Sequence, residues 1–216
     1  IARSAGAAIS ANPRSFEESP DRVGPDVYGN QVTGNSVNAL FVRIDTALGQ
    51  PLERLDIQAR FDDADIVHVI TENLQIVGNA GGPLLSAGGT LRARLGGRLA
   101  IDPGLVVKLN QSRIELERGA ANLIAEGQPG YPIVLRSQGE DRCGLGGTFE
   151  PNNAEHLWAN EAPPAPGQGG CLIFNHVSRG SLDHVLITLA GGETPLDGGF
   201  VNFNPVEVHQ ADLRLT

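Results

Sequence analysis

The chain has 216 residues, of which 40% are hydrophobic and 5% aromatic, with 28 glycines and 14 prolines. This composition predicts one large all-β domain or two small ones, built on an aliphatic core between frequent turns. The formal charge of −9 excludes general nucleic-acid binding, because phosphate contacts need clustered Lys and Arg. No apolar run reaches the roughly 20 residues needed to insert into a membrane.

The first 89 residues are predicted to hold two sections. Residues 1–45 contain apolar strings at 7–10 and 38–44 that are typical of strands, and we interpret them as the terminal coils of a first β-helix section. Residues 46–89 are less regular, with a strand-like string at 66–70. We interpret them as connecting or capping strands.

Residues 90–216 show the clearest pattern, that of a second β-helix section. Between residues 99 and 137, Val, Ile and Leu recur at two-residue intervals within short strings separated by turns of one to five residues: LAI, LVVKL, SRIELE, NLIAEG and YPIVLRS. Gly104, Gly119 and Gly127 fall where the backbone would bend, since Gly accepts positive φ. This spacing predicts a right-handed parallel β-helix, a solenoid of stacked parallel strands.

A long loop excursion at residues 139–170 interrupts this section and is the first candidate for a binding site, because long loops are usually functional or disordered. Trp158 lies in it, with His156 and Glu161 nearby. An exposed indole is a usual platform for sugar rings. A Trp that pins the loop to the coil is the alternative interpretation, and both stay open.

Two carboxylate and histidine pairs follow the excursion. Asp183 beside His184, and Glu207 two residues before His209, could supply the acid and base of a polysaccharide-cleaving site. On a regular strand Asp183 and His184 point to opposite faces, so only one of them would belong to such a site. Asp183 and His209 are therefore ligand-binding candidates, against the alternative of solvent-facing polar residues, and no catalytic residue is assigned.

Asp62, Asp63 and Asp65 form the one candidate metal site. Carboxylates one or two residues apart in a loop can converge on Ca²⁺, although this segment lacks the Gly and the distal Glu of an EF-hand loop. A solvated acidic turn is the alternative interpretation. Ca²⁺ is the only cofactor that the sequence suggests.

Cys143 and Cys171 are the only two cysteines of the chain. They flank the Pro-rich excursion, so a disulfide between them would staple that loop in an oxidising compartment. Two unrelated thiols, with Cys171 packed inward, are the alternative interpretation.

The strings that carry a likeness to known proteins are residues 98–109, 114–116, 119–120, 123–127, 132–137, 147–149, 165–167, 176–178, 181–184 and 203–209. With them the chain resembles the right-handed β-helix segments of large bacterial secreted or surface proteins. The multidomain proteins of planctomycete type look most similar. This resemblance implies an extracellular or cell-surface location and a role as scaffold, adhesin or spacer. It carries over no catalytic residue.

We therefore expect a non-enzymatic, structural or adhesive β-helix segment of a larger extracellular or cell-surface protein. The chain starts at Ile1 and contains no Met, which leads us to expect a piece of a longer polypeptide. Its open ends would stack on adjoining domains or on other copies of the chain. The alternative is a carbohydrate-binding or polysaccharide-cleaving β-helix with a glycan site under the 139–170 loop.

Overall fold

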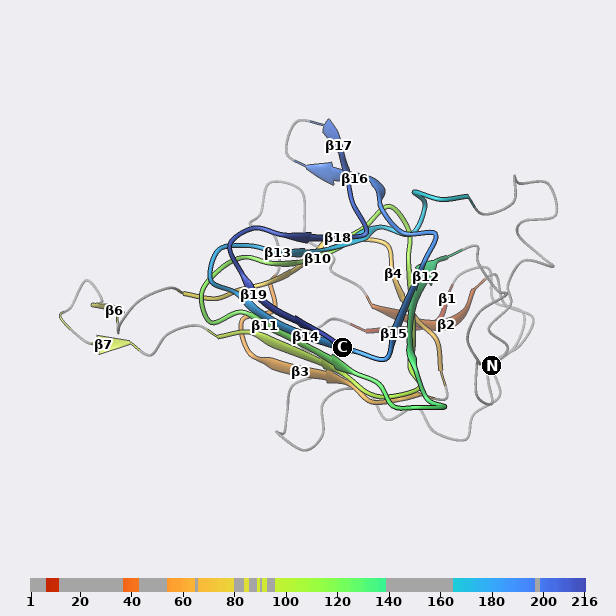
Figure 1. Ribbon diagram of the computed structural model, residues 1–216, viewed down its shortest axis with the longest axis horizontal. Helices are drawn as coiled ribbons and strands as arrows, with labels where there is room; N and C mark the ends of the chain where they lie inside the picture. The colour runs from red at the N-terminus through yellow and green to blue at the C-terminus, as the bar shows by residue number, and fades with distance from the viewer. Residues whose placement is uncertain are drawn as a thin grey trace.

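The computed structural model describes residues 7–11, 37–42, 54–64, 66–79, 84–85, 89, 91–92, 96–138, 165–196 and 199–216. In these parts the chain is all-β and has no helix (Figure 1). Accordingly, the described residues include no helix that would cross a membrane.

Most of the described strands belong to three parallel sheets. The six-stranded sheet contains β1 (Ala7–Ala11), β2 (Val37–Val42), β4 (His68–Ile70), β9 (Val106–Leu109), β12 (Ile133–Ser137) and β15 (Val185–Thr188). The five-stranded sheet contains β3 (Gln58–Phe61), β8 (Arg98–Ile101), β11 (Asn122–Glu126), β14 (Arg179–Asp183) and β19 (Asp212–Leu215). The four-stranded sheet contains β5 (Leu74–Ile76), β10 (Arg113–Leu116), β13 (Cys171–Phe174) and β18 (Val206–Val208).

Successive strands visit these sheets in a fixed order. β8, β9 and β10 enter the five-, six- and four-stranded sheets in turn, and β11, β12 and β13 repeat that order. Figure 1 shows the three sheets around a common interior. The prediction of an all-β chain with parallel strands is confirmed, and the arrangement is compatible with the predicted solenoid. The six-stranded sheet draws strands from all three predicted sections, whose boundaries stay a prediction.

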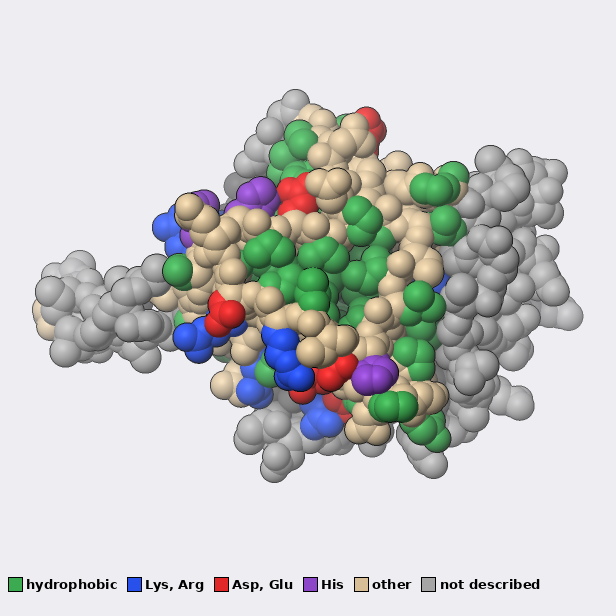
Figure 2. Space-filling model, in the orientation of Figure 1, with side chains coloured by type: hydrophobic (Ala, Val, Ile, Leu, Met, Phe, Trp, Pro, Cys, Tyr) green, Lys and Arg blue, Asp and Glu red, His purple; other side chains and the backbone are tan. Residues whose placement is uncertain are grey.

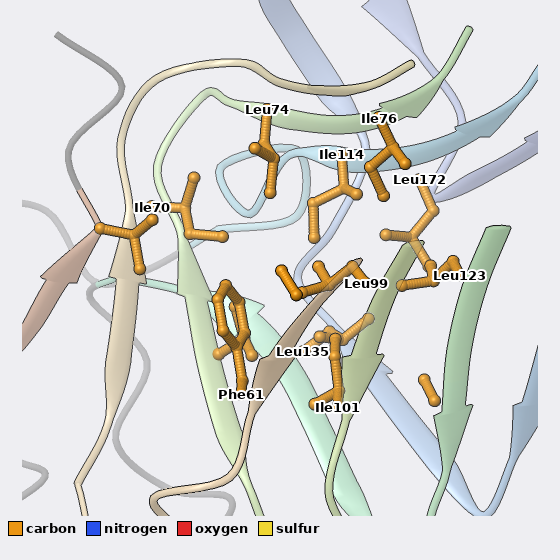
Figure 3. Close-up of a cluster of buried hydrophobic side chains, with 14 of the residues drawn as sticks. Phe61, Ile70, Leu74, Ile76, Leu99, Ile101, Ile114, Leu123, Leu135 and Leu172 are labelled. Atoms are coloured by element: carbon orange, nitrogen blue, oxygen red, sulfur yellow. The ribbon is translucent and has the colours of Figure 1, made fainter. Parts of the chain in front are cut away.

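The core is built from columns of aliphatic side chains. Each strand of a parallel pair lies in register with the next, as Leu99 does with Leu123 and Leu74 with Ile114. Inward-facing residues of all three sheets therefore meet in one buried cluster. Figure 3 shows ten of them pointing toward one another, from Phe61 through Leu172. The two-residue spacing of Val, Ile and Leu places every second side chain in this interior.

The bends between the sheets take left-handed residues. Gly104 has a φ of 83° and Gly119 a φ of 61°, as predicted for glycines at these turns. Gly127 is required for a different reason. A Cβ there would lie 2.7 Å from the carbonyl oxygen of His184, so close backbone approach excludes a side chain. Several bends instead place non-glycine residues at positive φ, among them Val177, His184 and Leu189.

Val177 is the least suited of these residues to its conformation. Its φ is 54° and its side chain is 59% exposed, so the β-branched side chain is strained and contributes little burial. We expect Val177→Gly to raise the free energy of unfolding by about 1 kcal/mol in urea titrations. The matched control is Val208→Gly in β18, where the side chain is 48% exposed and the change should destabilise. A loss of stability in Val177→Gly would contradict the strain argument.

An antiparallel hairpin projects from this body. It consists of β16 (Gly192–Leu196) and β17 (Gly199–Phe203), at the top of Figure 1. The buried guanidinium of Arg113 donates to Thr194 Oγ1 at 3.1 Å and to the carbonyl of Pro195, and lies 5.8 Å from the Phe203 ring. One side chain of the four-stranded sheet therefore anchors the hairpin. A second described hairpin pairs β6 (Leu84–Leu85) with β7 (Leu91–Arg92).

Candidate functional site: a polar hollow on the five-stranded sheet

The outer face of the five-stranded sheet is hollowed over β3, β8 and β11. The hollow has a volume of about 270 Å³. It is lined by Gln58, Ala59, Arg60, Arg98, Ala100, Ile101, Asp102, Pro103, Ile124 and Glu126. Most of these residues are the outward-facing members of three strands in register, so the sheet alone places them.

A small residue in the middle of a column makes room for the hollow. Arg60, Ala100 and Ile124 are aligned on β3, β8 and β11. Arg60 lies against Asp102, with Nε to Oδ1 at 2.8 Å and Nη2 to Oδ2 at 2.7 Å. This bidentate ion pair holds the Arg60 side chain at the turn after β8, and the methyl group of Ala100 leaves the centre open.

The two other charged side chains of the lining are held differently. Arg98 donates from Nη2 to Gln58 Oε1 at 2.9 Å, and it has no ion-pair partner in the described part of the chain. Glu126 Oε1 accepts from Ser181 Oγ at 2.6 Å and lies 3.6 Å from Arg214 Nη1. The site thus has a guanidinium on one side and a carboxylate on the other, both with hydrogen-bonding capacity left.

Asp183 on β14 is aligned with Glu126 on β11. It therefore lies next to Glu126 on the same sheet, on the side away from β8. His184 has a φ of 48°, which ends the strand and brings its Nδ1 within 2.6 Å of Asp183 Oδ1. The expectation that these neighbours point to opposite faces was made for a regular strand and does not apply at this bend, where the two side chains meet. The hydrogen bond with His184 is the main cause that lowers the pKa of Asp183, so this carboxylate is ionised and suited to accept hydrogen bonds rather than to donate a proton.

His209 belongs to another part of the molecule. It follows β18 in the four-stranded sheet, and its Nε2 lies 3.0 Å from Glu207 Oε2. The pKa of Glu207 is lowered chiefly by the backbone N–H of Asn204, which donates to Oε1 at 2.9 Å. His209 lies before the first residue of β19. Asp183 lies next to the other end of β19, because it follows Leu182, which is paired with Leu215. The length of that strand, on the order of 10 Å, separates the two predicted ligand-binding residues.

The remaining predicted loop residues, His156, Trp158 and Glu161, lie outside the described residues, so a site under the 139–170 loop stays a prediction. Asp65 also lies outside them, whereas Asp62 and Asp63 form a turn in which their carbonyls accept from Ala64 and Ile66. Within the described ranges, no three His, Cys, Asp or Glu side chains are grouped to hold a metal ion. The Ca²⁺ site likewise stays a prediction.

Cys171 is a buried, free thiol in β13. Its burial raises its pKa to about 12, so the thiol is protonated and poorly nucleophilic at neutral pH. Cys143 lies outside the described residues, and the disulfide between the two stays a prediction.

The hollow was missed because its residues are ordinary when each string is considered alone. The signal was the alignment of the strings: Arg60, Ala100 and Ile124 hold the same position in three successive segments. Superposing the segments would have shown a small residue between larger ones, next to two carboxylates.

Comparisons of the chain with protein-family models, with curated proteins and with solved structures find no match in any of the three.

Proposed function

We propose that this chain is a parallel β-helix segment with a structural or adhesive role in a larger extracellular or cell-surface protein. The order in which its strands enter the three sheets supports this architecture, because a chain that visits three parallel sheets in turn adds one strand to each sheet in every round. The location rests on the resemblance to bacterial surface proteins. The proposal assigns no catalytic residue.

The observation that carries the proposal is the face formed by the last strand of each sheet. β15, β18 and β19 end their sheets in the described part of the chain, so each presents an edge. The inward residues of this last round are only partly buried: Val185, Ile187, Val206, Ala211 and Leu213. Figure 2 shows hydrophobic side chains gathered between these strands. An apolar interior that is open at one end calls for another layer of strands.

We assign that layer to a further coil of parallel strands. The edges offer backbone donors and acceptors in the same parallel register that joins β14 to β19 and β13 to β18. An adjoining segment of the larger protein would supply this coil in the assembled molecule, and a second copy would supply it for the isolated chain. Stacking of this kind is how a solenoid transmits force along its axis or extends its length.

The test is the mass of the isolated 216-residue chain. We expect sedimentation equilibrium at micromolar concentrations to show self-association that Leu213→Glu abolishes, because this change places a charge in the open interior. The matched control is Leu196→Glu on the projecting hairpin, where the leucine is already exposed and association should persist. A wild-type chain that stays monomeric, or equal loss of association in both variants, would overturn the stacking proposal.

A further inference from the structure

We propose that the hollow on the five-stranded sheet binds a neutral glycan. Glycan binding at this hollow would be a second property of the chain, independent of its structural role. The hollow is the one place described above where donors, acceptors and apolar groups line the same concave surface. Concave sites with a few convergent polar groups are the usual sites of small-ligand binding.

The charges of the lining favour an uncharged ligand. Arg60 and Arg98 contribute two positive charges, and Asp102 and Glu126 contribute two negative charges. The bidentate pair of Arg60 with Asp102 neutralises half of this set within the protein. A phosphate or a nucleotide would be repelled by the carboxylates as well as attracted by the arginines, and the reverse holds for a polycation. A neutral polar ligand would meet no like-charge repulsion.

The hydrogen-bonding groups left over match hydroxyls. Arg98 uses Nη2 for Gln58, and a guanidinium carries five N–H groups, so further donors remain. Glu126 uses Oε1 for Ser181, so Oε2 remains an acceptor. A hydroxyl group both donates and accepts, and a neutral glycan carries hydroxyls along its length that could meet both side chains.

The floor of the hollow suits the apolar face of a sugar ring. Ala100 and Ile124 are adjacent on β8 and β11, and Pro103 adds apolar surface at the rim. Arg98 lies two residues before Ala100, and Glu126 two residues after Ile124, so the donor and acceptor flank this floor. At about 3.3 Å per residue, the two backbone positions are about 13 Å apart along the strands. Arg98 reaches toward Gln58 on β3 and Glu126 toward Ser181 on β14, so the two groups stand at opposite ends of the floor and would contact different parts of one glycan.

The experiment titrates the intact chain by isothermal calorimetry with cellohexaose, xylohexaose, mannohexaose and maltohexaose, and with polygalacturonate as a charged comparison. We expect saturable binding of at least one neutral hexasaccharide. Ala100→Ile, which fills the hollow, and Arg98→Gln, which removes the guanidinium, should each weaken that binding at least tenfold. Both positions face outward from the sheet, and thermal unfolding followed by circular dichroism will check that the variants are folded.

The matched control is Arg179→Gln. Arg179 lies in the same outward column as Arg98, two strands away and outside the hollow, so the change is chemically identical and should leave the affinity unchanged. Three results would overturn the assignment: no binding of any neutral hexasaccharide, binding of polygalacturonate alone, or binding that survives both Ala100→Ile and Arg98→Gln. If Arg179→Gln weakened the binding equally, the ligand would have to lie outside the hollow, and this result would also overturn the assignment.

Discussion

Replacing Gly180 with leucine is expected to lower the free energy of unfolding by about 3 kcal/mol, which is a large part of the stability of a typical domain. A Cβ at this position would lie 2.3 Å from the Phe174 ring and 2.8 Å from a methyl group of Leu213. The remainder of a leucine side chain would overlap these neighbours further. Because Phe174 is fully buried, it has no free space into which to move.

The expected loss of stability arises because two neighbouring positions of the core hold side chains of different size in successive rounds of strands. Phe174 is aligned with Leu116, and Gly180 is aligned with Leu123. The preceding round of strands thus fills the two positions with two leucines, and the following round fills them with a large ring and no side chain. The large ring thus occupies much of the space that a second leucine side chain would fill, and the distribution of volume between the two positions changes.

The double variant Phe174→Leu with Gly180→Leu restores the pair found in the preceding round. We expect it to regain most of the stability that Gly180→Leu loses, with a coupling energy of about 2 kcal/mol in a double-mutant cycle. Urea unfolding of the four proteins measures each corner of the cycle. If the double variant is no more stable than Gly180→Leu alone, the two residues do not share one packing space.

Acidification from pH 7 to pH 4 is expected to cost about 3 kcal/mol of stability through His68 alone. His68 is fully buried, its ring stacks on Phe61 with centroids 4.8 Å apart, and burial lowers its pKa from 6.5 to about 4. In the column it lies between Leu40 and Val107. A charged imidazolium in this interior would be strongly disfavoured.

The sign of the effect follows from where the proton binds. Between pH 6.5 and pH 4 the unfolded chain takes up a proton at His68 and the folded chain does not, so acid favours unfolding. The contribution of His68 to the free energy of unfolding is fully present above pH 6.5. It falls as the pH drops toward 4 and changes little below that pH. The whole difference between a pKa of 6.5 and one of about 4 corresponds to about 3.5 kcal/mol, and about 3 kcal/mol of this is lost between pH 7 and pH 4.

His68→Leu tests this prediction, because leucine matches the neighbours in the column. We expect the variant to have a flatter stability profile between pH 6.5 and pH 5 in urea titrations, a window above the lowered pKa values of Asp183 and Glu207. His176→Gln, at an exposed histidine, is the control and should keep the wild-type profile. A slope that survives in His68→Leu would assign the acid sensitivity to other groups.

The strands between residues 99 and 137 could be predicted because the signal for each is local. The five strings correspond to β8 through β12, and each needs only its own two-residue spacing and a nearby turn. The hairpin of β16 and β17 was not predicted. It is anchored by Arg113, which is 81 residues before Thr194, and no local pattern contains that contact.

The residues at the bends also divide into those that local sequence predicts and those that it does not. Gly104 and Gly119 were identified as turn residues because their chemistry permits positive φ. Val177 and His184 were not, because their intrinsic preferences oppose the conformation that they adopt. Hydrogen bonds between bends that are distant along the chain, such as Val177 N–H to the Gln210 carbonyl at 2.9 Å, help to hold that conformation.

By itself, the sequence determined that the chain is all-β with parallel strands and an aliphatic core, since apolar spacing and turn chemistry act within a few residues. Only the tertiary structure decided which side chains meet. Arg60 reaches Asp102 across 42 residues, and Phe174 fills the space left by Gly180. These contacts depend on the register between strands that are distant along the chain, and a register is set by the packing of the whole interior rather than by any one segment.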